Sequence, residues 1–388
     1  MGHAILSASG AARWLTCPPS AREEQKYPSE SSPYAREGTR AHALAEKHLK
    51  RYLETGDATV TFEEDAGMAE SVQSYVDTVV EKITEARTAS KDAQIFIEKK
   101  LDFSQWVPHG FGTGDAVILS DAFLEIIDLK YGKGVPVSAK NNPQMRLYAL
   151  GMYALMGWLY SAENVRMTIV QPRLDSISTE TITVKELLAW GESIKDIADK
   201  AFQGEGEYKA GDHCRFCRAR KVCRTRANAL KKVYRKAFAP GNELEPEEIA
   251  EIVLQAKNVQ TWLDEVKEYA RVKAISGEKW PGLKLVQGRS VRKIINKEDA
   301  GELLVSEGFP RDKIFKTQLC TITDLEKVCG RKKLKELLQD QHGYIIKPKG
   351  EPTLVSSDDK REEIQNIKDL FEEESQCKVY RLKPVLFV

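Results

Sequence analysis

The sequence predicts an α/β protein, in which a central mixed sheet is flanked by helices and followed by a helical and mixed C-terminal extension. Two observations support this prediction. First, two segments with apolar residues at helical spacing precede three short segments of alternating or aliphatic residues. Second, another helical segment separates the third strand from a fourth, and a crossover of this length favours a parallel pair. At 388 residues, the chain has room for two or three domains.

The individual elements follow from periodicity and from the residues that bound them. The first helix is expected to be entered from a Gly38-Thr39 turn, Ser120-Asp121 suits a hairpin turn, and Pro143 suits the first turn of a helix. We expect helices at 34–54, 66–89, 143–160, 183–202 and 245–275, and strands at 94–103, 114–120, 123–132 and 165–174.

Composition and local charge suggest how the chain is organised. A break at Ala239-Pro240-Gly241 predicts a domain boundary, with a first domain of residues 1–239 and an accessory domain of residues 240–388. The net charge of +1 points to no partner, but the segment 214–236 is strongly basic. No apolar run suits a membrane span and no secretory signal is evident, so we expect a cytoplasmic protein without a membrane partner.

Two acidic residues and a lysine fall on neighbouring predicted strands. Asp115 lies at the start of one strand, whereas Asp128 and Lys130 end the next and point to the same face. Two carboxylates can hold Mg²⁺ or Mn²⁺, which stabilises charge on a phosphate and lowers the pKa of a bound water, and a lysine can orient that water. The arrangement suits phosphodiester hydrolysis. Taken alone, Asp128 and Lys130 would be interpreted as a salt-bridged surface pair, because such pairs are common.

These residues belong to four short motifs in a fixed order. The motifs are GTRAH (38–42) on a helix, GTGD (112–115) on a strand, DLK (128–130) on the next strand and QMRLY (144–148) on the following helix. In kind and order they resemble the RecB-like branch of the PD-(D/E)XK nuclease superfamily, which implies a restriction-endonuclease-like sheet. The third motif has Asp where many relatives have Glu, which shortens its reach but keeps the ligand type.

The resemblance implies a role for each matching residue. Lys130 would be the catalytic lysine, and Gln144 and Tyr148, one helical turn apart, would line the site and contact the DNA backbone. The metal ligands would be His42, Asp115, Asp128 and the carbonyl of Leu129, with Glu98 as a less specific extra acid. Outside this set of motifs, His42 would be interpreted as an interior histidine and Tyr148 as a core residue.

A second group of candidate ligands consists of cysteines. Cys214, Cys217 and Cys223 lie in the basic segment, and the odd total of seven cysteines favours metal binding over a disulfide framework. Zinc would accept three thiolates and one more Cys or His, whereas an iron–sulfur cluster normally takes four Cys. His213 is adjacent to Cys214, a poor geometry for binding the same ion, which leaves Cys17 as the remaining candidate outside the C-terminal tail.

One upstream cysteine with three downstream resembles the iron–sulfur subgroup of RecB-like nucleases, including AddB and the CRISPR-adaptation nucleases. The resemblance implies a [4Fe–4S] cluster, with zinc as the alternative, that closes the nuclease domain through Cys17, Cys214, Cys217 and Cys223. The surrounding basic residues suit contacts with phosphates, although a solvated basic helix also explains them. The predicted DNA-contacting residues are Arg215, Arg218, Arg220, Lys221, Arg224 and Arg226.

The C-terminal part contains no catalytic motif. Its segments WPGLKLVQGRSVRK (280–293) and KPKGEPTLVSSDDKRE (347–362) are similar to a phage-encoded branch of these nucleases that carries an uncharacterised-domain label. Together, the resemblances imply a metal-dependent DNA nuclease, more an exonuclease on duplex ends or single strands than a sequence-specific endonuclease. Its setting would be recombination and repair, with recombination or replication proteins as partners. The alternatives are a non-catalytic DNA-binding accessory protein and a zinc-stabilised nuclease.

Overall fold

A five-stranded mixed sheet forms the centre of the molecule. The computed structural model describes residues 4–28, 33–62, 65–237, 244–284, 297–306, 310–311, 315, 321–341 and 344–345. The strands are β1 (Gln94–Asp102), β2 (Phe111–Leu119), β3 (Phe123–Leu129), β4 (Asn164–Gln171) and β5 (Ser176–Thr183), in the spatial order β1-β2-β3-β4-β5. Neighbouring strands are antiparallel except for β3 and β4, which are parallel. The predicted α/β class and the parallel pair are thus confirmed.

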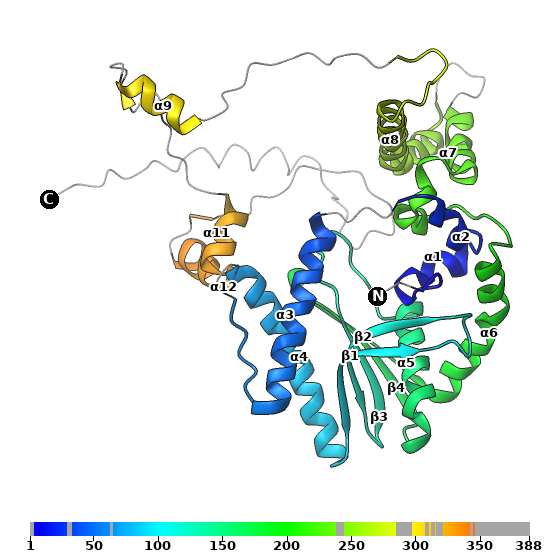
Figure 1. Cartoon of the computed structure of the whole chain (residues 1–388), viewed down its shortest axis with the longest axis vertical. Coiled ribbons are helices and arrows are strands. Elements are labelled where there is room, and N and C mark those ends of the chain that lie inside the picture. The colour runs from blue at the N-terminus through cyan, green and yellow to red at the C-terminus, as the bar shows by residue number, and fades with distance from the viewer. Residues whose placement is uncertain are drawn as a thin grey trace.

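Helices cover both faces of this sheet (Figure 1). On one face lie α3 (Pro33–Thr55) and α4 (Ala66–Ala89), which share a core with Ala116, Ile118 and Ile127 of the strands. On the other face lie α1 (Ala11–Thr16), α5 (Pro143–Met156) and α6 (Val184–Gln203), which share a core with Val117, Leu119 and Ile126. Because side chains alternate between the two faces along β2 and β3, these strands contribute residues to two separate hydrophobic cores.

The helices differ from the sequence prediction mainly at their ends. Helix α3 begins at Pro33, so Gly38 and Thr39 lie inside it and do not form the predicted turn at its start. Helix α5 begins as predicted, because the Asn142 side chain accepts hydrogen bonds from the backbone N–H groups of Gln144 and Met145. It ends at Met156 and continues as a short 3₁₀ turn, η3 (Gly157–Leu159).

The chain beyond the sheet is helical where the structure describes it. It forms α7 (Arg224–Ala237), α8 (Pro246–Ile275), α9 (Lys297–Ser306), α11 (Ile322–Cys329), α12 (Arg331–Leu334) and the π-helical turn η7 (Lys335–Gln341). The predicted boundary at 239–241 falls outside the described residues, as do the segments 285–293 and 347–362 of the two quoted C-terminal motifs. No helix in the described part of the chain combines the length and apolar character that a membrane span requires.

Helices α11 and α12 pack against the sheet domain through α4. The Glu70 carboxylate on α4 accepts hydrogen bonds from the backbone N–H groups of Arg331 and Lys332, at 2.5 and 3.1 Å, and so caps the start of α12. The Arg331 side chain also pairs with Asp175 at the turn between β4 and β5. A C-terminal segment is therefore attached at two points beside the sheet.

Candidate metal centre and cysteine cavity

The regular alternation of strand faces is broken where β1 and β2 lie opposite one another. Gly114 faces α5, because a Cβ atom there would contact Val117, whose side chain lies on the α5 face. Two residues on, Ala116 packs on the opposite face, against α3 and α4. Because neighbouring residues normally alternate, Asp115 and Ala116 must both face α3 and α4. Opposite Asp115 lies Glu98, with a left-handed φ of 52° that is costly for a residue other than glycine.

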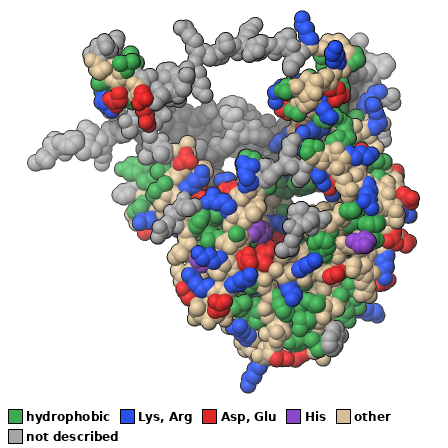
Figure 2. All heavy atoms as spheres, viewed as in Figure 1, with side chains coloured by type: hydrophobic (Ala, Val, Ile, Leu, Met, Phe, Trp, Pro, Cys, Tyr) green, Lys and Arg blue, Asp and Glu red, His purple; other side chains and the backbone are tan. Residues whose placement is uncertain are grey.

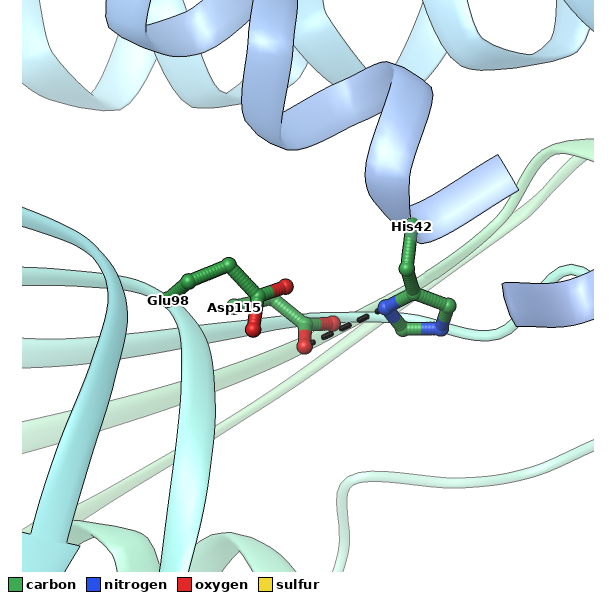
Figure 3. A group of neighbouring side chains, drawn as sticks. All are labelled: His42, Glu98 and Asp115. Carbon is green, nitrogen blue, oxygen red and sulfur yellow. Dashed lines mark ion pairs between the residues drawn. The ribbon is translucent and has the colours of Figure 1, made fainter. Parts of the chain in front are cut away.

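This break brings two acids toward a histidine on α3 (Figure 3). His42, Glu98 and Asp115 form a carboxylate cluster in which one ligand atom from each residue lies within 4.8 Å of the others. His42 Nδ1 is 3.3 Å from Asp115 Oδ1, and the other Asp115 oxygen accepts a hydrogen bond from the backbone N–H of Leu129 at 2.7 Å. The cluster thus offers one nitrogen and two carboxylate ligands to a cation.

The electrostatics of the carboxylate cluster favour positive charge. Burial, together with the negative charge of Asp115, raises the pKa of Glu98 to about 7. Burial lowers the pKa of His42, but the hydrogen bond and the charge of Asp115 outweigh it, so the pKa is raised overall. Both residues therefore hold protons more tightly than usual, Glu98 mainly because it is buried and His42 because it lies beside Asp115.

A second polar group lies on the α5 side of the same strand ends. Asp128 is 1% exposed, and its two oxygens lie 2.8 Å from Lys130 Nζ and 3.0 Å from Gln144 Nε2. Lys130 Nζ also donates to Gln144 Oε1 at 3.1 Å, and Gln144 Nε2 lies 3.3 Å from the Tyr148 hydroxyl. Because the Asp128 carboxylate is buried, its pairing with Lys130 is not that of a surface salt bridge.

Burial has opposite effects on the two members of this pair. It raises the pKa of Asp128, against the charge of Lys130, which lowers it. Burial also lowers the pKa of Lys130, but the negative charge of Asp128 more than compensates, and the pKa rises overall. Lys130 is therefore an ammonium ion at neutral pH, a hydrogen-bond donor rather than a base.

Gly112 allows Tyr148 to approach the sheet. A Cβ atom at Gly112 would stand 2.6 Å from Cε1 of Tyr148, closer than such atoms can come. The first residue of the GTGD motif therefore has a steric role, because it admits the ring that adjoins Gln144. Tyr148 itself is only 7% exposed, so Gln144 is the better placed of the two to reach a substrate.

The structure brings most of the predicted site residues together, but in two groups. His42 and Asp115 join Glu98 in the carboxylate cluster, while Asp128, Lys130, Gln144 and Tyr148 form the second group. The backbone N–H of Leu129 links the groups through its bond to Asp115. The sequence predicted Glu98 only as an extra acid, yet it is Glu98, and not Asp128, that lies within 4.8 Å of His42 and Asp115 in the carboxylate cluster.

The four predicted cluster cysteines line one cavity of about 20 Å³, here called the cysteine cavity. Cys17, at the end of α1, is buried, as is Cys217, which lies between two 3₁₀ turns. His213 also lines the cavity, with Nε2 3.8 Å from Cys214 Sγ. Among the described residues, the carboxylate cluster is the only group of three or more candidate ligands within 4.8 Å of one another.

Several of the predicted DNA-contacting residues are engaged within the protein. Arg220 and Arg226 each lie 2.6 Å from the Glu265 carboxylate on α8, and Arg218 lies 3.5 Å from Glu24. These ion pairs connect the segment around the cysteine cavity to two other helices. On the face shown in Figure 2, Lys and Arg side chains alternate with acidic ones and do not form one continuous basic patch.

Fold and site together define an α/β protein in which His42, Glu98 and Asp115 could hold a cation beside a buried Asp–Lys pair. The chain belongs to the family described as "Protein of unknown function (DUF2800)", whose model matches residues 3–362. Two solved structures were compared with it. The crystal structure of SSO0001 is 17% identical, with a TM-score of 0.23, and the match covers 49% of this chain and 98% of that one.

The second structure is that of a protein from Eubacterium rectale named "Putative exonuclease". It is 13% identical, with a TM-score of 0.32, and the match covers 56% of this chain and 89% of that one. TM-scores in this range carry no inference about fold or function. The assignment of a function therefore depends on the residues of the site.

Proposed function

We propose that this protein is a metal-dependent DNA nuclease of the RecB-like type, which hydrolyses phosphodiester bonds from DNA ends as an exonuclease. The observation that carries the proposal is the placement of the carboxylate cluster, with Asp115 in the middle of β2, beside the Asp128–Lys130–Gln144 group at the end of β3. In the proposed division of the chain, residues 1–239 carry this site and residues 240–388 are accessory. The protein would act in phage or host recombination and repair.

The donor set of the carboxylate cluster fits Mg²⁺ or Mn²⁺. His42, Glu98 and Asp115 would hold the cation, leaving coordination positions for water and for a phosphate oxygen. When bound, such a cation stabilises the charge that develops on the phosphate and lowers the pKa of a bound water. To act as a ligand, His42 must present an unprotonated Nδ1, so its present contact with Asp115 has to be exchanged.

Lys130 has the geometry to stabilise the phosphate during the reaction. An ammonium group has three N–H donors, of which Asp128 and Gln144 each occupy one. The third is available to a non-bridging phosphate oxygen or to the attacking water. Because Asp128 raises its pKa, Lys130 acts in this proposal by donating hydrogen bonds and positive charge, while Asp128 and Gln144 fix its position.

The cysteine cavity supports a structural cluster in the same protein. Thiolates are the ligands of zinc and of iron–sulfur clusters, and four of them face one cavity. Four cysteines match the usual donor set of a [4Fe–4S] cluster, which we propose here with zinc as the alternative. Such a cluster would join α1 to the segment after α6.

Degradation of end-labelled DNA tests the proposed activity. With Mg²⁺ or Mn²⁺, wild-type protein should shorten single-stranded or duplex DNA from unblocked ends. Asp115→Asn should lose both cation binding and cleavage, whereas Lys130→Met should keep cation binding and lose about 10²–10⁴-fold in rate. Lys195→Met, which changes a partly exposed lysine on α6 that pairs with Glu192, is the matched control and should leave the rate unchanged.

Two results would contradict the proposal. Equal cleavage by wild type and by both site variants would place the activity elsewhere or in a contaminant. DNA binding without cleavage by the wild type, under every cation, would identify the protein as a non-catalytic accessory factor. Blocking the 5′ or the 3′ end separately determines the polarity of the exonuclease, and a circular substrate that is cut would make it an endonuclease.

A further inference from the structure

A cavity of about 220 Å³ lies where the C-terminal helices meet the sheet domain, and it is here called the junction cavity. Tyr131 and Lys133, which follow β3, line it together with Arg173 in the 3₁₀ turn η4 (Pro172–Leu174) after β4. Lys327 of α11 and Arg331 of α12 line the same cavity. Two parts of the chain that are far apart in the sequence therefore form its wall.

The C-terminal part of this wall is packed closely on the sheet domain. Helices α11 and α12 lie beside α4 (Figure 1). A Cβ atom at Gly67, in the first turn of α4, would lie 3.2 Å from the carbonyl oxygen of Glu326, so the glycine lets the two backbones come close. The Glu70 carboxylate caps α12, and Arg331 lies 3.2 Å from Asp175. The residues of α11 and α12 thus have a defined position at the cavity.

The junction cavity lies next to the proposed catalytic residues. Because β3 and β4 are parallel, their carboxyl ends lie at one edge of the sheet, the edge at which α/β proteins commonly bind ligands. Lys133 follows Lys130 by three positions, at most about 11 Å of extended chain. Glu37, which also lines the cavity, precedes His42 on α3 by roughly 7.5 Å of helix axis. A DNA strand held at the carboxylate cluster can therefore place a phosphate about one to three nucleotides away in this cavity.

Basic side chains outnumber acidic ones in the junction cavity. The charged residues that line it are Lys133, Arg173, Lys327, Arg331, Glu37, Asp65 and Glu326. Two of the acids are already engaged, because Glu37 lies 3.0 Å from Arg173 and Asp65 accepts the backbone N–H of Met68 at 2.9 Å. Lys133 is exposed and has no ion pair within the described part of the chain. Its charge is therefore available to an anion.

Arg173 is held in position for the same task. Its guanidinium lies over the Tyr131 ring, 4.7 Å from the ring centroid, and donates to Glu37 at 3.0 Å. A guanidinium has five N–H donors, so the bond to Glu37 leaves donors for a phosphate oxygen. Because the ring and the carboxylate fix the guanidinium beforehand, little side-chain entropy is lost when an anion binds.

We infer that the junction cavity binds a phosphate group of the DNA strand on one side of the cleaved bond, through Lys133 and Arg173 of the sheet domain and Lys327 of α11. The inference rests on the proposed function, because it takes DNA as the substrate, and it deepens that function by giving α11 and α12 a part in substrate binding. The group bound is either a terminal phosphate or one within the strand. Arg331, which is engaged with Asp175, keeps the C-terminal wall in place.

DNA binding tests this inference without cleavage. Fluorescence anisotropy of labelled single-stranded DNA is measured across a salt series with Ca²⁺ in place of Mg²⁺. Lys133→Gln and Lys327→Gln should each weaken binding about 5-fold at low salt, and each should reduce the slope of log K against log salt concentration by about 0.7. Lys140→Gln changes an exposed lysine of the same loop that does not line the cavity, and it is the control that should change neither quantity.

A substitution of opposite sign separates phosphate binding from a structural role. Glu326→Gln removes a negative charge from the cavity and should strengthen DNA binding by about 2- to 5-fold at low salt. The urea unfolding midpoints of Lys133→Gln and Glu326→Gln should equal that of the wild type, whereas a purely structural role would lower them. Comparing DNA with and without a terminal phosphate identifies the group bound. A larger effect of Lys133→Gln on the phosphorylated strand assigns the cavity to the terminal phosphate, and an equal effect assigns it to a phosphate within the strand.

Four results would overturn the inference, and they are distinguishable from failure of the proposed nuclease. Unchanged affinity and slope in Lys133→Gln and Lys327→Gln, with cleavage by the wild type intact, would remove the phosphate site alone. An effect of Lys133→Gln without one of Lys327→Gln would remove α11 from the site. An equal loss in Lys140→Gln would show a general attraction of DNA to positive charge. A wild type that bound no DNA would refute the phosphate site and the proposed function together, whereas one that bound DNA without cleaving it under any cation would refute the nuclease alone.

Discussion

The carboxylate cluster and the cysteine cavity differ in how far protein contacts alone hold them together. In the first, His42 and the backbone of Leu129 already hold Asp115, and a second hydrogen-bonded group lies beside it. The cysteine cavity unites Cys17 with a segment of short 3₁₀ turns, and it depends on ion pairs around its rim. A ligand at the first site would bind to a preformed structure, whereas a ligand at the second would be part of what stabilises the structure.

The largest effect is expected at the cysteine cavity. Cys17→Ser removes one of four thiolates that join distant segments, and we expect the free energy of unfolding to fall by about 4 kcal/mol or more, beyond the usual range for one substitution. The visible absorbance of an anaerobically purified [4Fe–4S] protein should be lost as well. Cys329→Ser, which changes an exposed cysteine on α11, is the control. If the wild-type protein is colourless and contains stoichiometric zinc, the cysteine cavity holds zinc and not an iron–sulfur cluster. Unchanged stability of Cys17→Ser would remove the structural role altogether.

An intermediate effect, dependent on pH, is expected at the carboxylate cluster. The pKa of Glu98 is about 7 in the folded protein, against an ordinary value of 4.5, so the folded state binds the proton more tightly than the unfolded state. Stability therefore falls as the pH rises from about 4.5 through 7. In EDTA, Glu98→Gln should raise the free energy of unfolding by about 1 kcal/mol at pH 8 and leave it nearly unchanged at pH 5.

Added Mn²⁺ sharpens this test. At pH 8 the cation should stabilise the wild type more than Glu98→Gln, because the substitution removes a carboxylate ligand. If Glu98→Gln had the same effect on stability at pH 5 and pH 8 in EDTA, the proton on Glu98 would not be the cause. Measuring urea unfolding at both pH values, with and without Mn²⁺, distinguishes these cases.

The smallest effect is expected at the rim of the cysteine cavity. Glu265→Gln removes the charge that binds Arg220 and Arg226, at a cost of about 1 kcal/mol or less for such a partly exposed pair. If these arginines contact DNA, their release should increase the affinity for DNA at low salt. The slope of log K against log salt concentration should steepen by up to about 0.9 for each added phosphate contact. Fluorescence anisotropy across a salt series measures both. No change in slope would leave the two arginines with a structural role alone.

The main elements of the fold could be predicted from the sequence because their apolar patterns are strong. Within the sheet the exception is β5 at the edge, where six of the eight residues are Ser, Thr or Glu and only every second residue is half-buried. An edge strand of this kind has little apolar signal. The turn expected at Gly38-Thr39 was wrong, because Gly38 is tolerated inside α3 in open surroundings.

The division of the site into two groups could not be predicted. Regular strand alternation would place Asp115 and Asp128 on the same face of the sheet. The break in alternation lies opposite Glu98, and a left-handed backbone at a glutamate cannot be recognised from the residue type. The spatial meeting of Cys17 with Cys214, Cys217 and Cys223 was predicted from a resemblance and from counting ligands, and the four do line one cavity. The ion pairs of the basic segment with Glu24 and Glu265 depend on tertiary contacts that no local pattern shows.

The cysteine cavity also sets an order of events during synthesis. Cys17 leaves the ribosome about 200 residues before Cys223, which at about 5–20 residues per second is a delay of roughly 10–40 s. Throughout that interval the first thiol has no partners, while every strand of the sheet is already available to pair. The sheet can thus form before the cysteines meet. If the proposed cluster binds at the cysteine cavity, its delivery to a nearly finished domain would be the last step of folding, and its supply would limit how much mature protein a cell accumulates.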